Sequence, residues 1–273
     1  MSPPAAGAPI RTVLIGATGR MGREILRALP LFPALRLTGA VASPGSASIG
    51  EDAGARAGVA SVGVRIAPAL VPLLHEADLA IDFSSASAAA ANLAACVAGR
   101  IPLLLGATGL PPELLAALTD AAAAIPLLVA PNTSLAVNLL LELVAQAARA
   151  LPRSYDIELL ETHHRGKRDA PSGTALALAE AAAQARGATL AQVAVQARHG
   201  SLGPRAAGQI GIAVRRGGDV VGEHEVLFLG EGEQLGLRHV ATDRAVFARG
   251  ALQAAQWLAT RPPGRYEMKD IFK

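Results

Sequence analysis

The sequence predicts an α/β protein with a doubly wound parallel sheet in its first half and an α+β domain with a mixed, largely antiparallel sheet in its second half. Three features predict this fold. Short apolar runs alternate with helical patterns, glycine-containing turns follow several of these runs, and after residue 132 a hairpin signal between two strands indicates antiparallel pairing. A chain of 273 residues is long enough for two such domains.

The first half alternates between strands and helices. An apolar, β-branched run over residues 10–15 ends in glycine and leads into a helical pattern over 21–29. Further strands are predicted over 35–41, 79–83, 103–105 and 127–129, with helices over 86–98 and 111–123. Because buried runs of this kind pair in parallel, we expect ligands at the loops that leave the carboxyl ends of the strands.

The second half is predicted to mix helices with antiparallel strands. Helices are predicted over 135–150 and 174–186, and strands over 156–162, 209–214 and 220–229. Gly217 and Gly218 lie between the last two strands and are a hairpin signal. A final helix over 243–259 is expected to return to the first domain. The predicted domains are therefore residues 1–133 with 243–273, and residues 134–242.

Composition and charge exclude several classes of function. Aromatic residues make up only 3% of the chain and the formal net charge is +3, so nucleic acid is not expected as a partner. Cys96 is the only cysteine, which excludes an intrachain disulfide and a thiolate metal cluster and favours the cytoplasm. Residues 1–9 lack a basic segment followed by an apolar core, and no long apolar run has membrane-type flanks. We therefore expect neither a secretory leader nor a membrane partner.

A glycine-rich turn follows the first predicted strand and opens the first predicted helix, which is the context of a dinucleotide-binding loop. Small residues let the backbone approach a pyrophosphate, and the helix N-terminus adds partial positive charge. A tight turn without a ligand is the alternative, but the position in the chain favours the functional interpretation. The motif ends at Gly22, and the predicted Rossmann-like cofactor site includes Gly16, Ala17, Thr18, Gly19, Arg20 and Met21.

The end of the second predicted strand leaves the cofactor preference open. An acidic residue there would bind the ribose of NAD, and an arginine would favour the 2′-phosphate of NADP. The chain has Ala42 and Ser43 instead. Arg20, Ser43 and Ser46 can each bond a phosphate or a hydroxyl, so the sequence predicts NADH or NADPH without choosing between them.

Three further strand ends carry residues that suit a bound dinucleotide. The loops over 106–109 and 130–134, taken alone, are as compatible with plain helix capping as with ligand binding, and Thr133 and Ser134 are N-cap candidates. Their placement at successive strand ends favours binding. The additional cofactor candidates are Phe83, Gly106, Ala107, Thr108, Ala130, Pro131, Asn132 and Thr133.

The segment over 161–174 combines two adjacent histidines, a lysine and a Ser-Gly-Thr turn at the start of a helix. His163 and His164 can exchange protons near neutrality, and Lys167 can hold a carboxylate. Free N–H groups at the helix start, where Ser172, Gly173 and Thr174 lie, add a second place to bind an anion. With the glycine loop, this segment predicts a nicotinamide-dependent reductase of a small molecule that bears a carboxylate.

Other interpretations of these polar residues are weaker. Adjacent histidines point in different directions and no third ligand has suitable spacing, so a zinc site is not expected. Asp169 is predicted to orient Lys167 or the turn. His199, His224 and His239 are interpreted as structural, and Cys96 as an inert thiol in an alanine-rich helix.

The segment from Glu161 to Thr174, Glu-Thr-His-His-Arg-Gly-Lys-Arg-Asp-Ala-Pro-Ser-Gly-Thr, resembles the signature of the 4-hydroxy-tetrahydrodipicolinate reductase family. Supporting matches are residues 16–22, 81–84, 106–109, 130–134 and 221–225, and residues 243–250 resemble the segment that returns to the nucleotide domain. The resemblance extends over nearly the whole chain. It implies reduction of a cyclic imine dicarboxylate in lysine and diaminopimelate biosynthesis, by an enzyme that is usually a homotetramer joined through the sheet of its second domain.

The same resemblance implies roles for individual residues. His163 would donate or accept a proton and Lys167 would be the second proton donor, whereas His164, Ser172, Gly173 and Thr174 would bind substrate. The glycine loop, the loops over 106–108 and 130–133, and Arg244 would hold the dinucleotide. The family usually has an acidic residue followed by arginine where this chain has Ala42 and Ser43.

Two rival functions remain as alternatives. One is a regulator that senses the dinucleotide without chemistry, and the other is a different reductase of amino-acid metabolism, such as an aspartate dehydrogenase. The pair formed by His163 and Lys167 argues against the regulator, and the Pro-Ser-Gly-Thr turn argues against the other reductase. Because the two binding segments fall in different predicted domains, closure of the domains over the substrate is expected.

Overall fold

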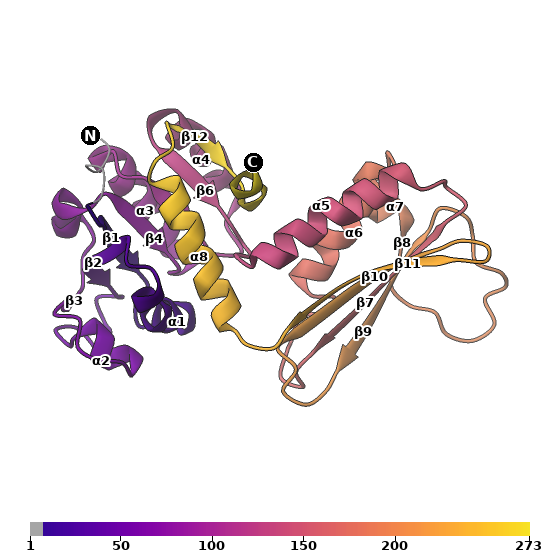
Figure 1. The fold of residues 1–273 in the computed structure, drawn as a ribbon, viewed down its shortest axis with the longest axis horizontal. Helices are drawn as coiled ribbons and strands as arrows, with labels where there is room; N and C mark the ends of the chain where they lie inside the picture. Colours follow the sequence, from indigo (N-terminus) through magenta and orange to yellow (C-terminus); the bar gives the residue numbers. More distant parts are fainter. Residues whose placement is uncertain (1–7) are drawn as a thin grey trace. The chain divides into compact units, whose positions relative to one another are not determined.

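The computed structural model describes residues 8–273, which form two compact units (Figure 1). The first unit contains the chain up to Leu135 together with Ala245–Lys273, and the second contains Ala136–Arg244. The expectation that no secretory leader is present rests on residues 1–9, most of which lie outside the described residues.

The first unit is built on a parallel sheet of seven strands in the order β12-β6-β5-β4-β1-β2-β3. Every pair of neighbouring strands in this sheet is parallel, as predicted. The strands are β1 (Ile10–Ile15), β2 (Leu35–Val41), β3 (Ile66–Ala67), β4 (Leu79–Asp82), β5 (Leu103–Leu105), β6 (Pro126–Val129) and β12 (Gly264–Tyr266). The sequence did not predict the edge strands, because β3 has only two residues and β12, Gly-Arg-Tyr, lacks an apolar run.

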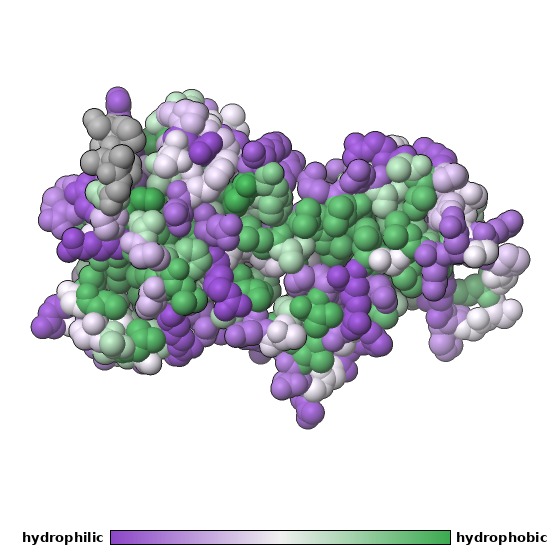
Figure 2. Space-filling view, viewed as in Figure 1, coloured by the Kyte–Doolittle hydropathy of each residue, from purple (hydrophilic) through white to green (hydrophobic). Residues whose placement is uncertain are grey.

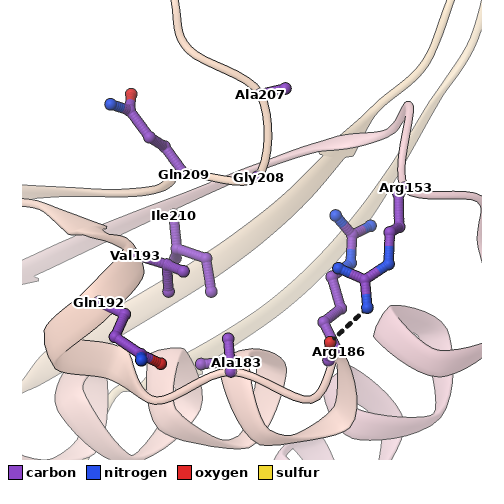
Figure 3. A pocket seen from close by; sticks show the side chains of 10 residues that line it. Arg153, Ala183, Arg186, Gln192, Val193, Ala207, Gly208, Gln209 and Ile210 are labelled. Carbon is purple, nitrogen blue, oxygen red and sulfur yellow. Dashed lines mark hydrogen bonds between the residues drawn. The ribbon is translucent and has the colours of Figure 1, made fainter.

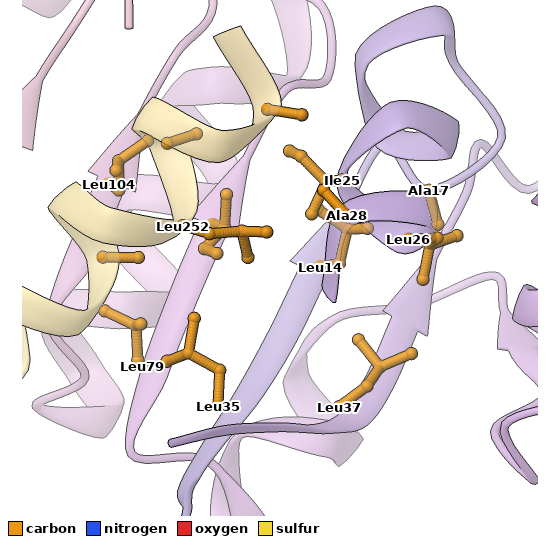
Figure 4. Packing of buried hydrophobic residues seen from close by; sticks show 14 of the residues in the cluster. Leu14, Ala17, Ile25, Leu26, Ala28, Leu35, Leu37, Leu79, Leu104 and Leu252 are labelled. Atoms are coloured by element: carbon orange, nitrogen blue, oxygen red, sulfur yellow. The ribbon is translucent and has the colours of Figure 1, made fainter. Parts of the chain in front are cut away.

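Helices cover both faces of this sheet. The helices are α1 (Arg20–Ala28), α2 (Ala53–Ala57), α3 (Ala86–Gly99), α4 (Pro112–Ala124) and α8 (Ala245–Leu258), with 3₁₀ turns η1 (Leu29–Leu31), η2 (Val71–Glu76) and η3 (Met268–Phe272). On one face, α1 and α8 bury Ile25, Leu26 and Leu252 against Leu14 of β1 and Leu104 of β5 (Figure 4). The other face has its own buried cluster, to which α3 and α4 contribute. The predicted doubly wound fold is confirmed.

The strand order places the first glycine loop at the point where the winding direction changes. From β1 the chain proceeds to β2 and β3 on one side, and then crosses to β4, β5 and β6 on the other. The carboxyl ends of β1 and β4 lie side by side, since Ile15 pairs with Asp82. In doubly wound sheets, ligands bind in the crevice at this switch point.

The second unit packs helices on one face of a five-stranded mixed sheet with the order β11-β10-β7-β9-β8. Its elements are α5 (Leu135–Ala150), β7 (Asp156–His163), α6 (Gly173–Ala185), α7 (Leu190–Val193), β8 (Ala194–Val195), β9 (Ile210–Arg216), β10 (Gly222–Leu229) and β11 (Gln234–Ala241). Residues of β7 alternate between the two faces, and Ile157 and Leu159 join the core beneath the helices. Glu161 and His163 continue the same face, so the strand periodicity places both polar side chains at the edge of this core.

The predicted hairpin at Gly217 and Gly218 is wrong. Strands β9 and β10 are not paired with each other but flank β7, which is parallel to β9 and antiparallel to β10. The hairpin instead joins β10 to β11. The sequence did not reveal β11 because most of its residues are exposed and it lacks the apolar run of a buried strand.

Within the described residues, no helix has the length and apolar character to cross a bilayer. Cys96 is buried in α3, and burial raises the pKa of its thiol to about 12, which fits the predicted inert role. Figure 2 shows apolar surface over α5, and on this helix Leu139 and Leu143 are 46% and 40% exposed.

Candidate active site

The glycine loop after β1 packs tightly against neighbouring backbone. Gly16 adopts a φ of +82°, which a side chain would strain, and a Cβ there would lie 2.6 Å from the carbonyl oxygen of Phe83. A Cβ at Gly22 would lie 2.3 Å from the carbonyl oxygen of Gly16. The loop and the first turn of α1 therefore pack backbone against backbone, which leaves no room for a larger residue at either position.

The N-terminus of α1 is open to an anion. Its N-cap is Gly19, no side chain caps the helix, and the first turn contains no acidic residue. The N–H groups of an uncapped helix start are suited to a pyrophosphate, so the residues present fit the predicted cofactor. Arg20 is exposed at the first position of α1, and Ser43 is exposed in the loop that follows β2.

The loops after β4 and β5 meet beside the glycine loop. The backbone N–H of Phe83 donates to the carbonyl of Ile15, and the ring of Phe83 packs against the backbone of Gly106. Buried Asp82 holds this turn, because its carboxylate accepts hydrogen bonds from the Ser84 N–H at 2.8 Å and from Asn92 Nδ2 at 2.9 Å. No role for Asp82 was predicted, although its side chain anchors the loop that carries Phe83.

The loop over 130–133 is fixed by α8. Thr133 is buried and its hydroxyl donates to the carbonyl of Phe247 at 2.7 Å, while Asn132 Oδ1 accepts from the Ser134 N–H at 2.9 Å. Thr133 therefore makes a structural contact with α8, and its role in binding the dinucleotide stays a prediction. Arg244 is exposed and is the last residue of the second unit, so its predicted role in holding the dinucleotide stays a prediction.

The second unit gathers the histidine segment around a buried carboxylate. Glu161 is fully buried, and its Oε2 lies 2.5 Å from His163 Nδ1. Arg216, from β9, donates from its two terminal nitrogens to both oxygens of Glu161, at 2.7 and 2.8 Å. The backbone N–H of Ser172 donates to Glu161 Oε1 at 3.0 Å. One carboxylate thus joins the end of β7, the end of β9 and the start of α6.

The loop between β7 and α6 returns to this cluster. Lys167 forms an ion pair with Asp169 at 2.9 Å, a contact consistent with the first of the two roles predicted for Asp169. The carbonyl of Asp169 accepts a hydrogen bond from Arg216 at 2.8 Å. Ser172 is the N-cap of α6, because its hydroxyl accepts from the Ala175 N–H at 3.1 Å. The structure therefore places His163, Lys167 and Ser172 around one local network.

His224 belongs to the same network and not to a separate structural position. Its Nε2 lies 3.0 Å from the hydroxyl of Ser172, and its ring meets that of His163 edge-on at 5.2 Å between centroids. Burial lowers the pKa of His224 to about 4, so this ring is neutral at physiological pH. The interpretation of His224 as purely structural missed its contact with two of the predicted site residues.

The protonation of His163 reflects opposing influences. Burial lowers its pKa below the ordinary value, and the charges of Lys167 and Arg216 lower it further, whereas Glu161 raises it. For Glu161 itself, burial would raise the pKa, but hydrogen bonds from Arg216, His163 and the Ser172 N–H hold it below its usual range. A buried carboxylate stays charged beside a histidine, which is an arrangement suited to acid–base chemistry.

A pocket of about 350 Å³ lies elsewhere in the second unit (Figure 3). Its polar lining includes Arg153 and Arg186, but Arg186 donates to the carbonyls of Ala148 and Tyr155, and Arg153 donates to the carbonyl of Arg186. These guanidinium groups link the end of α6 to the end of α5 and to the loop before β7. Because none of the predicted site residues lines this pocket, it is not a candidate for the reaction site.

Comparison with known proteins decides what this arrangement belongs to. A family model described as the N-terminus of dihydrodipicolinate reductase matches residues 10–133, and one described as its C-terminus matches residues 136–272. The chain belongs to the dihydrodipicolinate reductase family. It is therefore an oxidoreductase with a nicotinamide dinucleotide cofactor, and neither a dinucleotide-sensing regulator nor an aspartate dehydrogenase is favoured.

Relatives within the dihydrodipicolinate reductase family match the chain along nearly its full length. The 4-hydroxy-tetrahydrodipicolinate reductase of Anaeromyxobacter sp. (strain Fw109-5) is 50% identical over 262 residues, which is 96% of this chain and 97% of the relative. The reductase of the same name from Myxococcus xanthus (strain DK1622) is 48% identical over 264 residues, with the same coverage. The dipicolinate-bound dihydrodipicolinate reductase from Paenisporosarcina sp. TG-14 shares the fold, with a TM-score of 0.76 at 24% identity over 95% of this chain and 97% of that chain.

Proposed function

We propose that this chain reduces the cyclic imine dicarboxylate formed from 4-hydroxy-tetrahydrodipicolinate, giving tetrahydrodipicolinate in lysine and diaminopimelate biosynthesis. The names of relatives that are 48 to 50% identical support the reaction. The observation that carries the proposal is the cluster in which His163 and the start of α6 contact the buried carboxylate of Glu161, while the charge of Lys167 acts on His163. This cluster combines proton donors with an anion site.

The substrate would be held through a carboxylate. Lys167 supplies a positive charge, and the start of α6 supplies backbone N–H groups at Gly173 and Thr174, which adds the positive end of the helix dipole. His164 is half-buried in the same loop. Fixing a carboxylate at this point would orient the ring of the substrate and lower the entropic cost of the reaction.

The proton would come from His163 or Lys167. A bound reduced nicotinamide would supply the hydride, and one of the two side chains would protonate the neighbouring atom of the substrate. The hydrogen bond between His163 Nδ1 and Glu161 leaves Nε2 as the ring nitrogen that exchanges a proton with the substrate. Lys167 can both hold the carboxylate and donate a proton.

The reaction can be tested directly by the loss of absorbance of NADH or NADPH. The substrate is the condensation product of pyruvate and aspartate semialdehyde, and each dinucleotide is supplied separately. Substrate-dependent oxidation of at least one of them is expected. If neither is oxidised while the folded protein binds dinucleotide, the proposed reaction is wrong.

We further propose that the exposed loop after β2 determines the choice of cofactor. This loop has neither an acidic residue nor an arginine at Ala42 and Ser43, so both NADH and NADPH should be accepted. Ser43→Glu is expected to weaken NADPH relative to NADH by about tenfold, because a negative charge repels the 2′-phosphate, and Ser43→Arg is expected to do the opposite.

The measurement is kcat/KM for each cofactor in the two variants and the wild type. The two variants control for each other, because they place opposite charges at the same position. Ser43 is exposed, so neither change disturbs the core. Equal preference in all three proteins would place the 2′ position of the ribose away from this loop.

We also propose that the chain forms a homotetramer and is located in the cytoplasm. The helices of the second unit cover one face of its sheet, and the opposite face carries Leu160, Leu227 and Val240, of which Val240 is 42% exposed. An uncovered face with apolar side chains suits contact with another copy of the chain. Light scattering should give a mass about four times that of the chain, and a monomeric mass would reject the tetramer.

A further inference from the structure

The carboxylate of Glu161 makes more contacts than a passive buried charge requires. It is fully buried and takes four hydrogen bonds, one from His163, one from the Ser172 N–H and two from Arg216. The two bonds from Arg216 are the parallel pair that a guanidinium forms with a carboxylate, and this geometry fixes the plane of the carboxylate. Arg216 thereby keeps Glu161 charged and in place.

The contact with His163 fixes which ring nitrogen carries the proton. A charged carboxylate accepts hydrogen bonds and cannot donate one, so Nδ1 of His163 must be the donor at 2.5 Å. Nε2 is then the nitrogen that gains and loses a proton. Free histidine has no such constraint, and the tautomer is set by the partner of the other nitrogen.

The charged groups around His163 come from each element that packs on it. They are Glu161 on β7, Arg216 on β9, Lys167 in the loop before α6 and His224 on β10. Burial lowers the pKa of His163, and Lys167 and Arg216 act in the same direction. Glu161 is the group that raises it, so the ability of His163 to carry a proton depends on this carboxylate.

The contact with Ser172 links the same carboxylate to the start of α6. Ser172 is buried, its N–H donates to Glu161, and its hydroxyl caps the helix and meets His224 at 3.0 Å. A displacement of the Glu161 carboxylate would therefore move both the histidine and the first residues of the helix.

We propose that Glu161 is the positioning residue of this enzyme, which holds His163 with its proton on Nδ1 and fixes the start of α6 relative to that ring. The expected effect of Glu161 on turnover rests on the proposed role of His163 as a proton donor. The expected effect of Glu161 on the tautomer and titration of His163 does not depend on that role.

The decisive variant is Glu161→Gln, which removes the charge and keeps the size of the side chain. We expect the pKa of His163 to fall, because the group that raises it is neutralised. The high-pH limb of kcat/KM, where the donor loses its proton, should then move to lower pH, and kcat near pH 7 should fall about tenfold. The Kd for NADH should not change, since Glu161 lies in the second unit and the glycine loop in the first.

Two other variants separate positioning from plain structural support. Glu161→Asp restores the charge, so it should return the pH profile towards that of the wild type. Glu158→Gln is the matched control, because Glu158 lies on the same strand and is paired with two arginines but faces away from His163. A purely structural role of Glu161 would reduce the amount of folded protein without moving the limb.

Nuclear magnetic resonance of the imidazole nitrogens makes the proposal testable even if Glu161→Gln does not fold. In the wild-type protein, the neutral form of His163 should carry its proton on Nδ1, and a proton on Nε2 would overturn the proposal. An unchanged titration of His163 in folded Glu161→Gln would also overturn it. If the titration moves while His163→Ala retains normal turnover, the positioning stands and the proposed role of His163 in proton transfer fails.

Discussion

Replacement of His163 by alanine should lower kcat about 100-fold or more, and replacement of Lys167 by alanine should have an effect of similar size. The reason is that each variant removes a group able to deliver the proton that must accompany hydride transfer. Both side chains lie in the second unit, whereas the glycine loop lies in the first. The Kd for NADH, measured by fluorescence, should therefore change little in either variant.

Matched controls are available in the same part of the chain. Arg168 is exposed beside Lys167, and His199 is an exposed histidine, and neither has been given a role in the site. Arg168→Ala and His199→Ala should keep turnover close to the wild-type value. Normal turnover in both His163→Ala and Lys167→Ala would reject the proposed proton donors. A large rise in KM without a change in kcat would assign Lys167 to binding alone.

The first unit could be predicted because its signals are local. Each buried strand is a continuous apolar run, each loop after it contains small residues, and residues 16–22 occupy the turn between a strand and a helix. The switch point then follows from the order of strands and helices. Asp82 escaped notice because a single aspartate at a strand end has no pattern, and only the structure reveals its bonds to Ser84 and Asn92.

The histidine cluster could be predicted only in part. His163, Lys167 and Ser172 lie within ten residues of one another, so their meeting follows from the sequence. Glu161 was within reach of the same reasoning, because residues two apart on a strand share a face. Arg216 and His224 were not, since their arrival depends on the pairing of β9 and β10 with β7. The wrong hairpin at Gly217 and Gly218 would have placed these two strands beside each other and hidden the network.

The second large effect concerns stability in acid and depends on His224. His224 is only 5% exposed, and its Nδ1 has no hydrogen-bond partner among the described residues. The centroid of its ring lies 5.2 Å from that of His163. Burial and the neighbouring His163 lower the pKa of His224 from 6.5 to about 4. The folded state therefore keeps this ring neutral over a pH range in which the unfolded chain binds a proton.

The sign of the effect follows from proton linkage. The stabilisation is fully present above pH 6.5 and is lost as the pH falls towards 4, because only the unfolded chain takes up the proton in that interval. At about 1.4 kcal/mol per unit of pKa difference, the loss reaches about 2 kcal/mol by pH 5 and about 3 kcal/mol in total. His163, whose pKa is also lowered, adds in the same direction, and Glu161 contributes only at still lower pH.

Hydrogen exchange can measure this loss in the second unit alone. After correction for the intrinsic pH dependence of exchange, amides of β7 and β10 should lose protection between pH 7 and pH 5, whereas those of β4 and β5 in the first unit should not. In His224→Gln the amide can replace Nε2 as the partner of Ser172, so the protein should fold and the pH dependence should shrink by about 2 kcal/mol. His199→Gln, which removes an exposed histidine, should leave the dependence intact. Equal pH dependence in the wild type and His224→Gln would mean that the ring of His224 takes up its proton without unfolding, and that its burial does not limit stability in acid.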